Sequence, residues 1–242
     1  MKIVAIVQAR MGSTRLPKKV LIDIAGKTML ERTIERIQRC TEITEVMVAT
    51  TDQYADDVIV AECDHMGIQC FRGSEEDVLD RYTQAALSVQ ADIIVRFTAD
   101  CPLIDAEIIS VVLSKFLEEK PDYASTVLKR TYPRGLDTEV LSMNALQRVW
   151  EEAKQKHERE HVTPYILENP EKFSVLSVEG EADYSSHRWT VDTPEDLALV
   201  QAIYEALGED GTFGWKDIID LIENNPEIHQ LNANIEQKSL KD

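Results

Sequence analysis

The sequence predicts an α/β protein with a mostly parallel central sheet and helices on both of its faces. Short apolar runs rich in β-branched residues alternate with segments whose apolar residues recur at helical spacing. This alternation implies right-handed crossovers and parallel strands. The chain has 242 residues, of which 43% are hydrophobic, and this is enough apolar material for one large domain.

The first half of the chain shows the alternation most clearly. We expect strands at residues 2–8, 45–50, 68–71 and 92–97, and helices at residues 28–40, 55–66, 75–89 and 106–119. Thr28, with Glu31 three residues later, favours a capped start for the first helix. Ligands of such sheets bind at the carboxyl ends of the strands, so the loops that follow the strands are the places to look for a site.

The regular alternation of predicted strands and helices ends after about Lys120. We expect short strand-like pieces within residues 121–142, a charged helix up to about Glu158, further strands at 173–178 and 188–191, and helices from Pro194 and from Trp215. Thr193 and Pro194 are typical of the N-cap and first position of a helix.

The overall charge restricts the partners. The chain has 26 Lys and Arg against 44 Asp and Glu, a net charge of −18, so a nucleic acid or an anionic membrane is not expected as a partner. No apolar run approaches the roughly 18 residues of a membrane span, and Arg10 interrupts the N-terminal apolar run before it reads as a signal peptide. We therefore expect a cytoplasmic protein with reduced cysteines.

A basic loop follows the first predicted strand. Residues 1–22 contain five basic residues and no acidic one, and four of the five lie within residues 8–19. Arg and Lys supply charge for phosphate oxygens, and Gly12 and Ser13 allow backbone N–H groups to turn towards a ligand. The loop therefore predicts a phosphate site, and a merely solvated basic loop is the alternative.

Two familiar phosphate motifs are excluded. A dinucleotide fingerprint needs three glycines, and this loop contains only Gly12. The sequence Gly26-Lys27-Thr28 resembles the end of a P-loop, but Leu21 occupies the place of the earlier glycine. Neither an NAD enzyme nor a Walker-type ATPase fits.

The segment RMGSTRLPKK, residues 10–19, resembles the nucleotide-binding loop of sugar nucleotidyltransferases. It is most similar to that of synthetases that activate acidic sugars, KDO and sialate, as CMP derivatives. Four further segments agree in order with this resemblance: residues 72–81, 98–102, 132–139 and 188–197. The whole pattern is similar to the SpsF-type cytidylyltransferase-like proteins of spore-coat and surface polysaccharide synthesis.

This resemblance implies a nucleotide-diphospho-sugar transferase fold, which is GT-A-like and Rossmann-type, with a small substrate or dimer lobe. It also implies transfer of CMP from CTP to an acidic sugar or sugar phosphate, release of pyrophosphate, a magnesium cofactor and a homodimer. The single domain 1–242 would comprise a nucleotide-binding half (1–120), a sugar-binding or dimer lobe (121–186), and a return strand with C-terminal helices (187–242).

The resemblance also assigns roles to residues. Arg15, Lys19 and Asp100 would be catalytic, and Asp100 and Asp192 would hold the metal. The nucleotide-binding set would be Gln8, Ala9, Arg10, Met11, Gly12, Ser13, Arg15, Lys19, Arg72, Ser74 and Arg81. The substrate-binding set would be Arg134, Asp137, Glu139 and His161.

Each of the less certain residues has a structural alternative. Asp100 stands before Cys101-Pro102 and could be a turn former, and Asp192 could be a second local cap. Arg134 could form a surface salt bridge, and His161 could be a structural histidine. Ala99 stands where the family often has glycine, so a positive φ is not expected at that position.

Two other functional classes stay open. A glycosyltransferase that uses a nucleotide sugar would usually show an Asp-x-Asp metal motif, and Thr98-Ala99-Asp100 lacks the first Asp. A non-catalytic protein that binds a nucleotide would bind CTP without releasing pyrophosphate.

Overall fold

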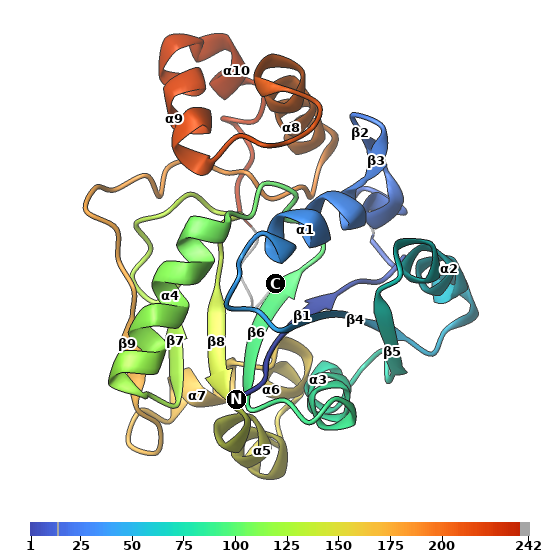
Figure 1. Cartoon of the computed structure of the whole chain (residues 1–242), viewed down its shortest axis with the longest axis vertical. Coiled ribbons are helices and arrows are strands. Elements are labelled where there is room, and N and C mark those ends of the chain that lie inside the picture. Colours follow the sequence, from blue (N-terminus) through green and yellow to red (C-terminus); the bar gives the residue numbers. More distant parts are fainter. Residues whose placement is uncertain (14, 238–242) are drawn as a thin grey trace.

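The computed structural model describes residues 1–13 and 15–237, and its centre is a twisted sheet (Figure 1). The strands of this sheet are β1 (Ile3–Gln8), β4 (Glu45–Thr51), β5 (Gln69–Gly73), β6 (Ile93–Thr98), β7 (Tyr123–Ser125), β8 (Glu139–Ser142) and β9 (Val175–Ser177). They follow the order β5-β4-β1-β6-β8-β7-β9. A separate two-stranded hairpin consists of β2 (Asp23–Ile24) and β3 (Lys27–Thr28).

The α-helices of the described chain are α1 (Met29–Gln38), α2 (Asp57–Met66), α3 (Val78–Ser88), α4 (Ala106–Glu119), α5 (Met143–Glu152), α6 (Lys156–His161), α7 (Pro164–Glu168), α8 (Pro194–Leu207), α9 (Trp215–Asn224) and α10 (Pro226–Gln230). Two short 3-10 helices occupy Lys19–Leu21 and Tyr54–Asp56. In the part of the chain that the structure describes, no helix is long and apolar enough to cross a membrane.

The sheet is mostly parallel, as the alternation of strands and helices predicts. β1 pairs in parallel with both β4 and β6, and β4 pairs in parallel with β5. β8 runs antiparallel to its neighbours β6 and β7, while β7 and β9 are parallel. The strands of residues 121–186 therefore extend the main sheet and do not form a sheet of their own.

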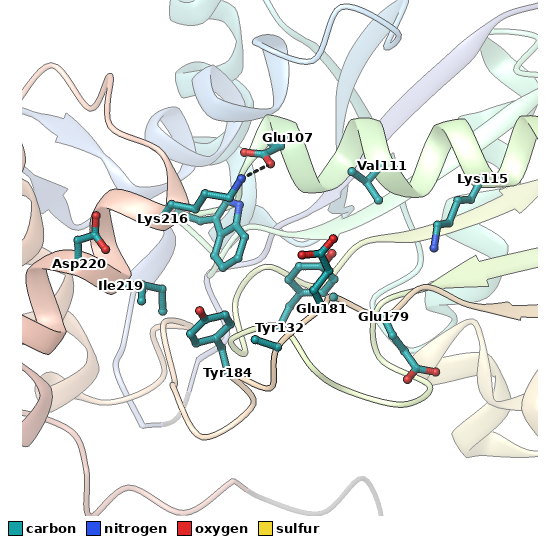
Figure 2. A pocket seen from close by; sticks show the side chains of 13 residues that line it. Glu107, Val111, Lys115, Tyr132, Glu179, Glu181, Tyr184, Lys216, Ile219 and Asp220 are labelled. Atoms are coloured by element: carbon teal, nitrogen blue, oxygen red, sulfur yellow. Dashed lines mark hydrogen bonds and ion pairs between the residues drawn. The ribbon is translucent and has the colours of Figure 1, made fainter.

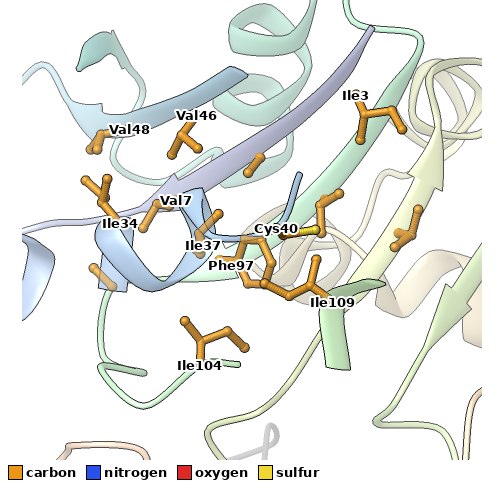
Figure 3. Packing of buried hydrophobic residues seen from close by; sticks show 14 of the residues in the cluster. Ile3, Val7, Ile34, Ile37, Cys40, Val46, Val48, Phe97, Ile104 and Ile109 are labelled. Atoms are coloured by element: carbon orange, nitrogen blue, oxygen red, sulfur yellow. The ribbon is translucent and has the colours of Figure 1, made fainter. Parts of the chain in front are cut away.

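Both faces of the sheet are covered by helices. Alternate residues of β1 point to opposite faces, as the pleat requires. Ile3, Ala5 and Val7 pack with α1, α2 and α4, a cluster that Figure 3 shows in part. Val4 and Ile6 pack on the other face with α3 and α5. Burial on both faces explains why this strand reads as one continuous apolar run.

A third apolar cluster lies outside the sheet. It joins α8 and α9 to Met29 at the start of α1 and to the fully buried Trp189. Figure 1 shows α8, α9 and α10 together, above α1 in that view. This cluster fixes the segment that leads into α8, which matters for the site described below.

Two expectations from the sequence were wrong in detail. Residues 188–191 form no regular strand, because Trp189 N–H donates to the Arg134 carbonyl and Val191 N–H to the Asp100 carbonyl, two different parts of the chain. The expected charged helix up to Glu158 is broken after α5. The Glu158 carboxylate accepts hydrogen bonds from the N–H groups of Lys154 and Gln155, which starts the separate helix α6.

The helix starts at Thr28 and Thr193 are confirmed. Thr28 Oγ1 accepts from Glu31 N–H at 3.1 Å, and Thr193 Oγ1 accepts from Asp196 N–H at 3.3 Å. Asp196 also accepts from Thr193 N–H at 3.0 Å, which completes a capping box. Pro194 occupies the first turn of α8, as expected.

Replacement of Thr193 by Ala should lower the free energy of unfolding by about 1 kcal/mol, since the first turn of α8 loses one acceptor. Chemical denaturation of the two proteins measures this difference. Thr41→Ala is the control, because Thr41 is exposed and lies outside any helix start. An equal loss in both variants would contradict a capping role for Thr193.

Candidate functional site

The predicted basic loop lies over a cleft of about 270 Å³ at the carboxyl ends of β1 and β6. Such a position is where ligands of open α/β sheets bind. Eight residues of the sequence-predicted site line this cleft: Gln8, Arg10, Gly12, Ser13, Arg15, Lys19, Asp100 and Asp192. The fold thus brings together two acidic residues and a basic loop that are far apart in the sequence.

Lys19 is the centre of the cleft. Its Nζ donates to Asp100 Oδ2 at 2.9 Å, to Asp192 Oδ1 at 2.8 Å and to the Val191 carbonyl at 3.0 Å. Burial by itself lowers the pKa of Lys19, but the two carboxylates outweigh this and hold its pKa above the ordinary value. Lys19 is therefore a fixed positive charge between two negative ones.

Asp192 lies among three cations. Besides Lys19, Arg15 Nη2 is 3.1 Å and Arg188 Nη2 is 2.8 Å from Asp192 Oδ2. Burial by itself raises the pKa of Asp192, but Lys19, Arg188 and Arg15 together hold its pKa below the ordinary value. The carboxylate is therefore ionised at neutral pH, as a metal ligand must be.

Asp100 is oriented from its own strand end. Thr98 Oγ1, at the end of β6, donates to Asp100 Oδ1 at 2.5 Å, while Lys19 contacts the other oxygen. Among the described residues, Ala99 is not one of those with positive φ, so alanine is tolerated there as expected. The Asp100 side chain is thus aimed into the cleft and is not consumed by a turn.

The segment that carries Asp192 approaches residues 134–136 closely. Gly135 has φ of 107°, and a Cβ at this position would lie 2.7 Å from Thr190 N. Only glycine fits both the conformation and the contact. This close approach supports the Arg134–Trp189 backbone bond and so the position of Asp192.

The structure provides a plausible pair of metal ligands. Carboxylate oxygens are the donors that Mg²⁺ prefers. Asp100 Oδ2 and Asp192 Oδ1 already converge on one cationic atom, Lys19 Nζ. The donor set therefore fits a divalent cation held jointly by these two residues and a bound ligand.

Sequence reasoning missed the residue that anchors the basic loop. Asp56, which is 3% exposed, accepts from Met11 N–H at 2.8 Å through Oδ1. Its Oδ2 accepts from the Thr51 N–H and hydroxyl groups. Asp56 lies just before α2, where an acidic residue is typical of an N-cap, so its sequence context hides this role.

Ser13 N–H donates within the loop to the Met11 carbonyl, and this donor is not directed at the cleft.

The three predicted nucleotide-binding residues outside the basic loop do not line the cleft, and neither do Ala9 and Met11 within it. Arg72 donates to the Thr51 and Gln53 carbonyls and pairs with Asp57 at 2.6 Å. Ser74 Oγ accepts a hydrogen bond from Asp77 N–H. The fully buried Arg81 donates to the Ser74 carbonyl. These residues shape the turn after β5, so their expected place in the nucleotide pocket is not reproduced.

The substrate-binding residues predicted in the second half divide into two pairs. The Glu139 carboxylate is buried and accepts from the Tyr123 and Thr163 hydroxyls, at 2.6 and 2.9 Å, and from Arg96. Asp137 is held by Arg130 through both of its oxygens. These two carboxylates thus have partners within the chain, and their contact with a substrate stays a prediction.

Arg134 and His161 are better placed to meet a ligand. In the described part of the chain, the Arg134 guanidinium has no ion pair, and burial together with the nearby Arg130 lowers its pKa. His161 is half-buried at the end of α6, and burial lowers its pKa below the ordinary value. Neither lines the cleft around Lys19.

A larger cavity of about 690 Å³ lies elsewhere, between α4, α9 and residues 179–184 (Figure 2). It has aromatic walls from Tyr132, Tyr184 and Trp215, and Glu107 pairs across its edge with Lys216 at 2.7 Å. None of the residues predicted for the site lines it. Its size alone therefore does not make it the reactive centre.

Replacement of Asp56 by Asn should weaken CTP binding about tenfold, because the amide can no longer accept hydrogen bonds on both sides and a bond to a charged acceptor is lost. Calorimetric titration with CTP measures the effect. Asp57→Asn is the matched control, since the neighbouring Asp57 carboxylate is exposed and pairs only outside the loop. Equal affinities of the Asp56→Asn variant and the parent would contradict the anchoring role.

Comparisons with known proteins agree with this geometry. SpsF of Bacillus subtilis, a spore coat polysaccharide biosynthesis protein, is 33% identical over 232 residues, which are 93% of this chain and 95% of that protein. The solved structure of a cytidylyltransferase from Leptospira borgpetersenii is 35% identical, with a TM-score of 0.91, and the match covers 99% of this chain and 100% of that one.

A more distant structure shares the fold. It is CMP:2-keto-3-deoxy-manno-octonic acid synthetase complexed with CTP, at 22% identity and a TM-score of 0.67, covering 86% of this chain and all of that one. A family model described as cytidylyltransferase matches residues 4–239. These matches confirm the α/β fold and the resemblance drawn from the sequence. The chain belongs to the cytidylyltransferase family.

Proposed function

We propose that this protein transfers CMP from CTP to an acidic sugar or sugar phosphate and releases pyrophosphate, in the synthesis of a surface polysaccharide such as that of a spore coat. The observation that carries this proposal is the cleft itself, where Lys19 of the basic loop meets Asp100 and Asp192 at the carboxyl ends of parallel strands. The family membership and the spore-coat relative support the same activity.

The basic loop is suited to bind the triphosphate. Arg10 and Arg15 both line the cleft and are only partly buried, so their guanidinium groups are available for phosphate oxygens. Charge-assisted hydrogen bonds of this kind are short and strong. The loop needs this concentration of positive charge because the chain as a whole, with a net charge of −18, repels a polyphosphate.

Asp100 and Asp192 would hold a magnesium ion, which when bound neutralises charge on the phosphates. Thr98 and Arg188 orient the two carboxylates from behind. Lys19 stands between the carboxylates in the ligand-free protein and can turn to the phosphates when another cation satisfies them. Its ammonium group then stabilises the charge that develops on the leaving pyrophosphate.

In the reaction, an oxygen of the sugar attacks the α-phosphorus of CTP, and the bond from that phosphorus to the bridging oxygen breaks. Phosphoryl-type transfer relies on positioning and electrostatic stabilisation, so no covalent intermediate with the chain is required. Arg134 is our candidate for binding a carboxylate or phosphate of the sugar, because its planar guanidinium has no ion pair within the described chain. His161 remains a candidate contact for the same substrate.

We also propose that the enzyme acts in the cytoplasm as a homodimer. The four cysteines are free, which suits a reducing compartment. β9 lies at an edge of the sheet, and its Val175 is an exposed apolar residue that a second copy could cover.

A pyrophosphate-release assay of the four nucleoside triphosphates, each with Mg²⁺ and a panel of sugar acids and sugar phosphates, tests the proposal. We expect release only with CTP and one of the sugars, and loss of at least 100-fold in rate for Asp100→Asn, because the amide keeps the shape but removes the charge that holds the cation. Asp105→Asn is not suitable as a control since Asp105 caps α4, so the exposed Asp52→Asn serves instead.

Two results would contradict the proposal. CTP binding without pyrophosphate release from any sugar in the panel would indicate a non-catalytic protein. Release from Asp100→Asn within about threefold of the parent rate would remove Asp100 from the metal site.

A further inference from the structure

The proposed metal ligand Asp192 is held by an arginine outside the basic loop, Arg188, which does not line the cleft. Arg188 is 9% exposed, and its Nη2 lies 2.8 Å from Asp192 Oδ2. The same guanidinium donates through Nε to Asp196 Oδ1 at 2.9 Å and through Nη2 to Asp196 Oδ2 at 3.2 Å. A planar guanidinium held at two edges fixes the direction of the carboxylate it contacts.

The two oxygens of Asp192 have different partners, and Arg188 shares Oδ2 with Arg15 of the basic loop. Arg188 takes Oδ2, whereas Lys19 takes Oδ1 on the side of Asp100. Arg15 and Lys19 belong to the basic loop and are drawn to phosphates when a nucleotide binds. Arg188 does not line the cleft, so it is the cation that stays with Asp192.

Asp196 serves two structures at once. It caps α8, and its fully buried carboxylate also accepts from Asp192 N–H at 3.0 Å and from Arg188. The Asp196 carboxylate thus binds both the backbone N–H of Asp192 and Arg188, which is the side-chain partner of Asp192. A capping role alone would not require the contact with Arg188.

The C-terminal segment closes this cluster from the other side. Asn232 is 5% exposed, and its Nδ2 donates to the Arg188 carbonyl and to Asp196 Oδ1, both at 2.9 Å. Arg188 Nη1 donates to Gln237 Oε1. Asn232 is 44 residues from Arg188 in the sequence, so the chain returns from α10 specifically to this place (Figure 1).

We propose that Asn232 and Gln237 are positioning residues that act through Arg188 and Asp196 to keep Oδ1 of Asp192 directed at the metal site. This inference rests on the proposed function, because it assigns a role to the chain's end in that same reaction. Groups behind a metal ligand commonly change metal affinity by 10- to 100-fold when they are removed. The C-terminal segment is then part of the active-site scaffold, although neither Asn232 nor Gln237 lines the cleft.

The test compares Asn232→Ala with Asn225→Ala. Asn225 is a matched control because its amide donates to the Leu221 carbonyl in the same part of the chain and has no contact with Arg188. For each protein at saturating CTP, the rise in melting temperature is followed as Mg²⁺ is increased, and the Mg²⁺ concentration for half the rise is recorded. Melting without ligands reports the loss of stability alone.

We expect Asn232→Ala to need about tenfold more Mg²⁺ than the parent, and Asn225→Ala to need the same amount as the parent. Gln237→Ala should shift the requirement in the same direction by a smaller factor, and it keeps the test valid if Asn232→Ala does not fold. A full stabilisation at high Mg²⁺ in the variants would support positioning rather than loss of the site.

An unchanged Mg²⁺ requirement in both Asn232→Ala and Gln237→Ala, with the parent showing a clear requirement, would overturn this inference and leave the proposed function intact. If the parent itself binds CTP without any effect of Mg²⁺, the metal part of the proposed function fails and this inference fails with it. The two failures are therefore distinguishable by the parent protein alone.

Discussion

The contact of the Lys19 ammonium with Asp100 and Asp192 is the interaction on which the site depends. It ties the loop after β1, the end of β6 and the segment before α8 to one point. Two carboxylates that both lie within 3 Å of one nitrogen repel each other, and the cation between them offsets this repulsion. The cleft therefore places two carboxylates around one cationic group, Lys19.

Neighbouring residues hold the basic loop and the two carboxylates in position through hydrogen bonds. Asp56 holds the basic loop by its backbone, Thr98 orients Asp100, and Arg188 orients Asp192. Asp56 and Arg188 lie outside the lining of the cleft, whereas Thr98 is part of it. Preorganised groups of this kind reduce the rearrangement that binding and reaction require, which is how electrostatic stabilisation becomes effective. A polar network that is satisfied before the ligand arrives is also consistent with a site in which positioning does most of the catalysis.

Much of the fold and the centre of the site could be predicted from local sequence patterns. The apolar run of β1 predicts a strand buried on both faces, and the basic residues after it predict a phosphate site, because both signals lie within a few neighbouring residues. Asp100 and Asp192 were placed correctly in the cleft, since each follows an apolar segment that ends near the loop. That they bind a metal stays a prediction.

The remaining features depend on contacts between distant residues. The segment at 188–191 looks like a strand, yet its N–H groups find partners in two separate places, which no local pattern reveals. Glu139 occurs in a motif that suggests a substrate contact, but the Tyr123 and Thr163 hydroxyls both donate to its Oε1, and Arg96 donates to its Oε2. Asp56 was missed because it resembles an ordinary helix cap. Arg188 stands four residues before Asp192, a spacing that could have drawn attention to it, but its partner Asn232 lies far away in sequence.

The central claim is that Lys19 occupies the place of a divalent cation until the nucleotide binds. The most direct measurement is the affinity of the nucleotide-free protein for Mn²⁺, which prefers the same oxygen ligands as Mg²⁺, compared between the parent and Lys19→Met. Methionine keeps much of the side-chain length without the charge, so the two carboxylates lose their internal cation. We predict that Lys19→Met binds Mn²⁺ more tightly than the parent in the absence of nucleotide, and binds CTP more weakly. An equal or lower affinity for Mn²⁺ in a folded Lys19→Met protein would contradict the account.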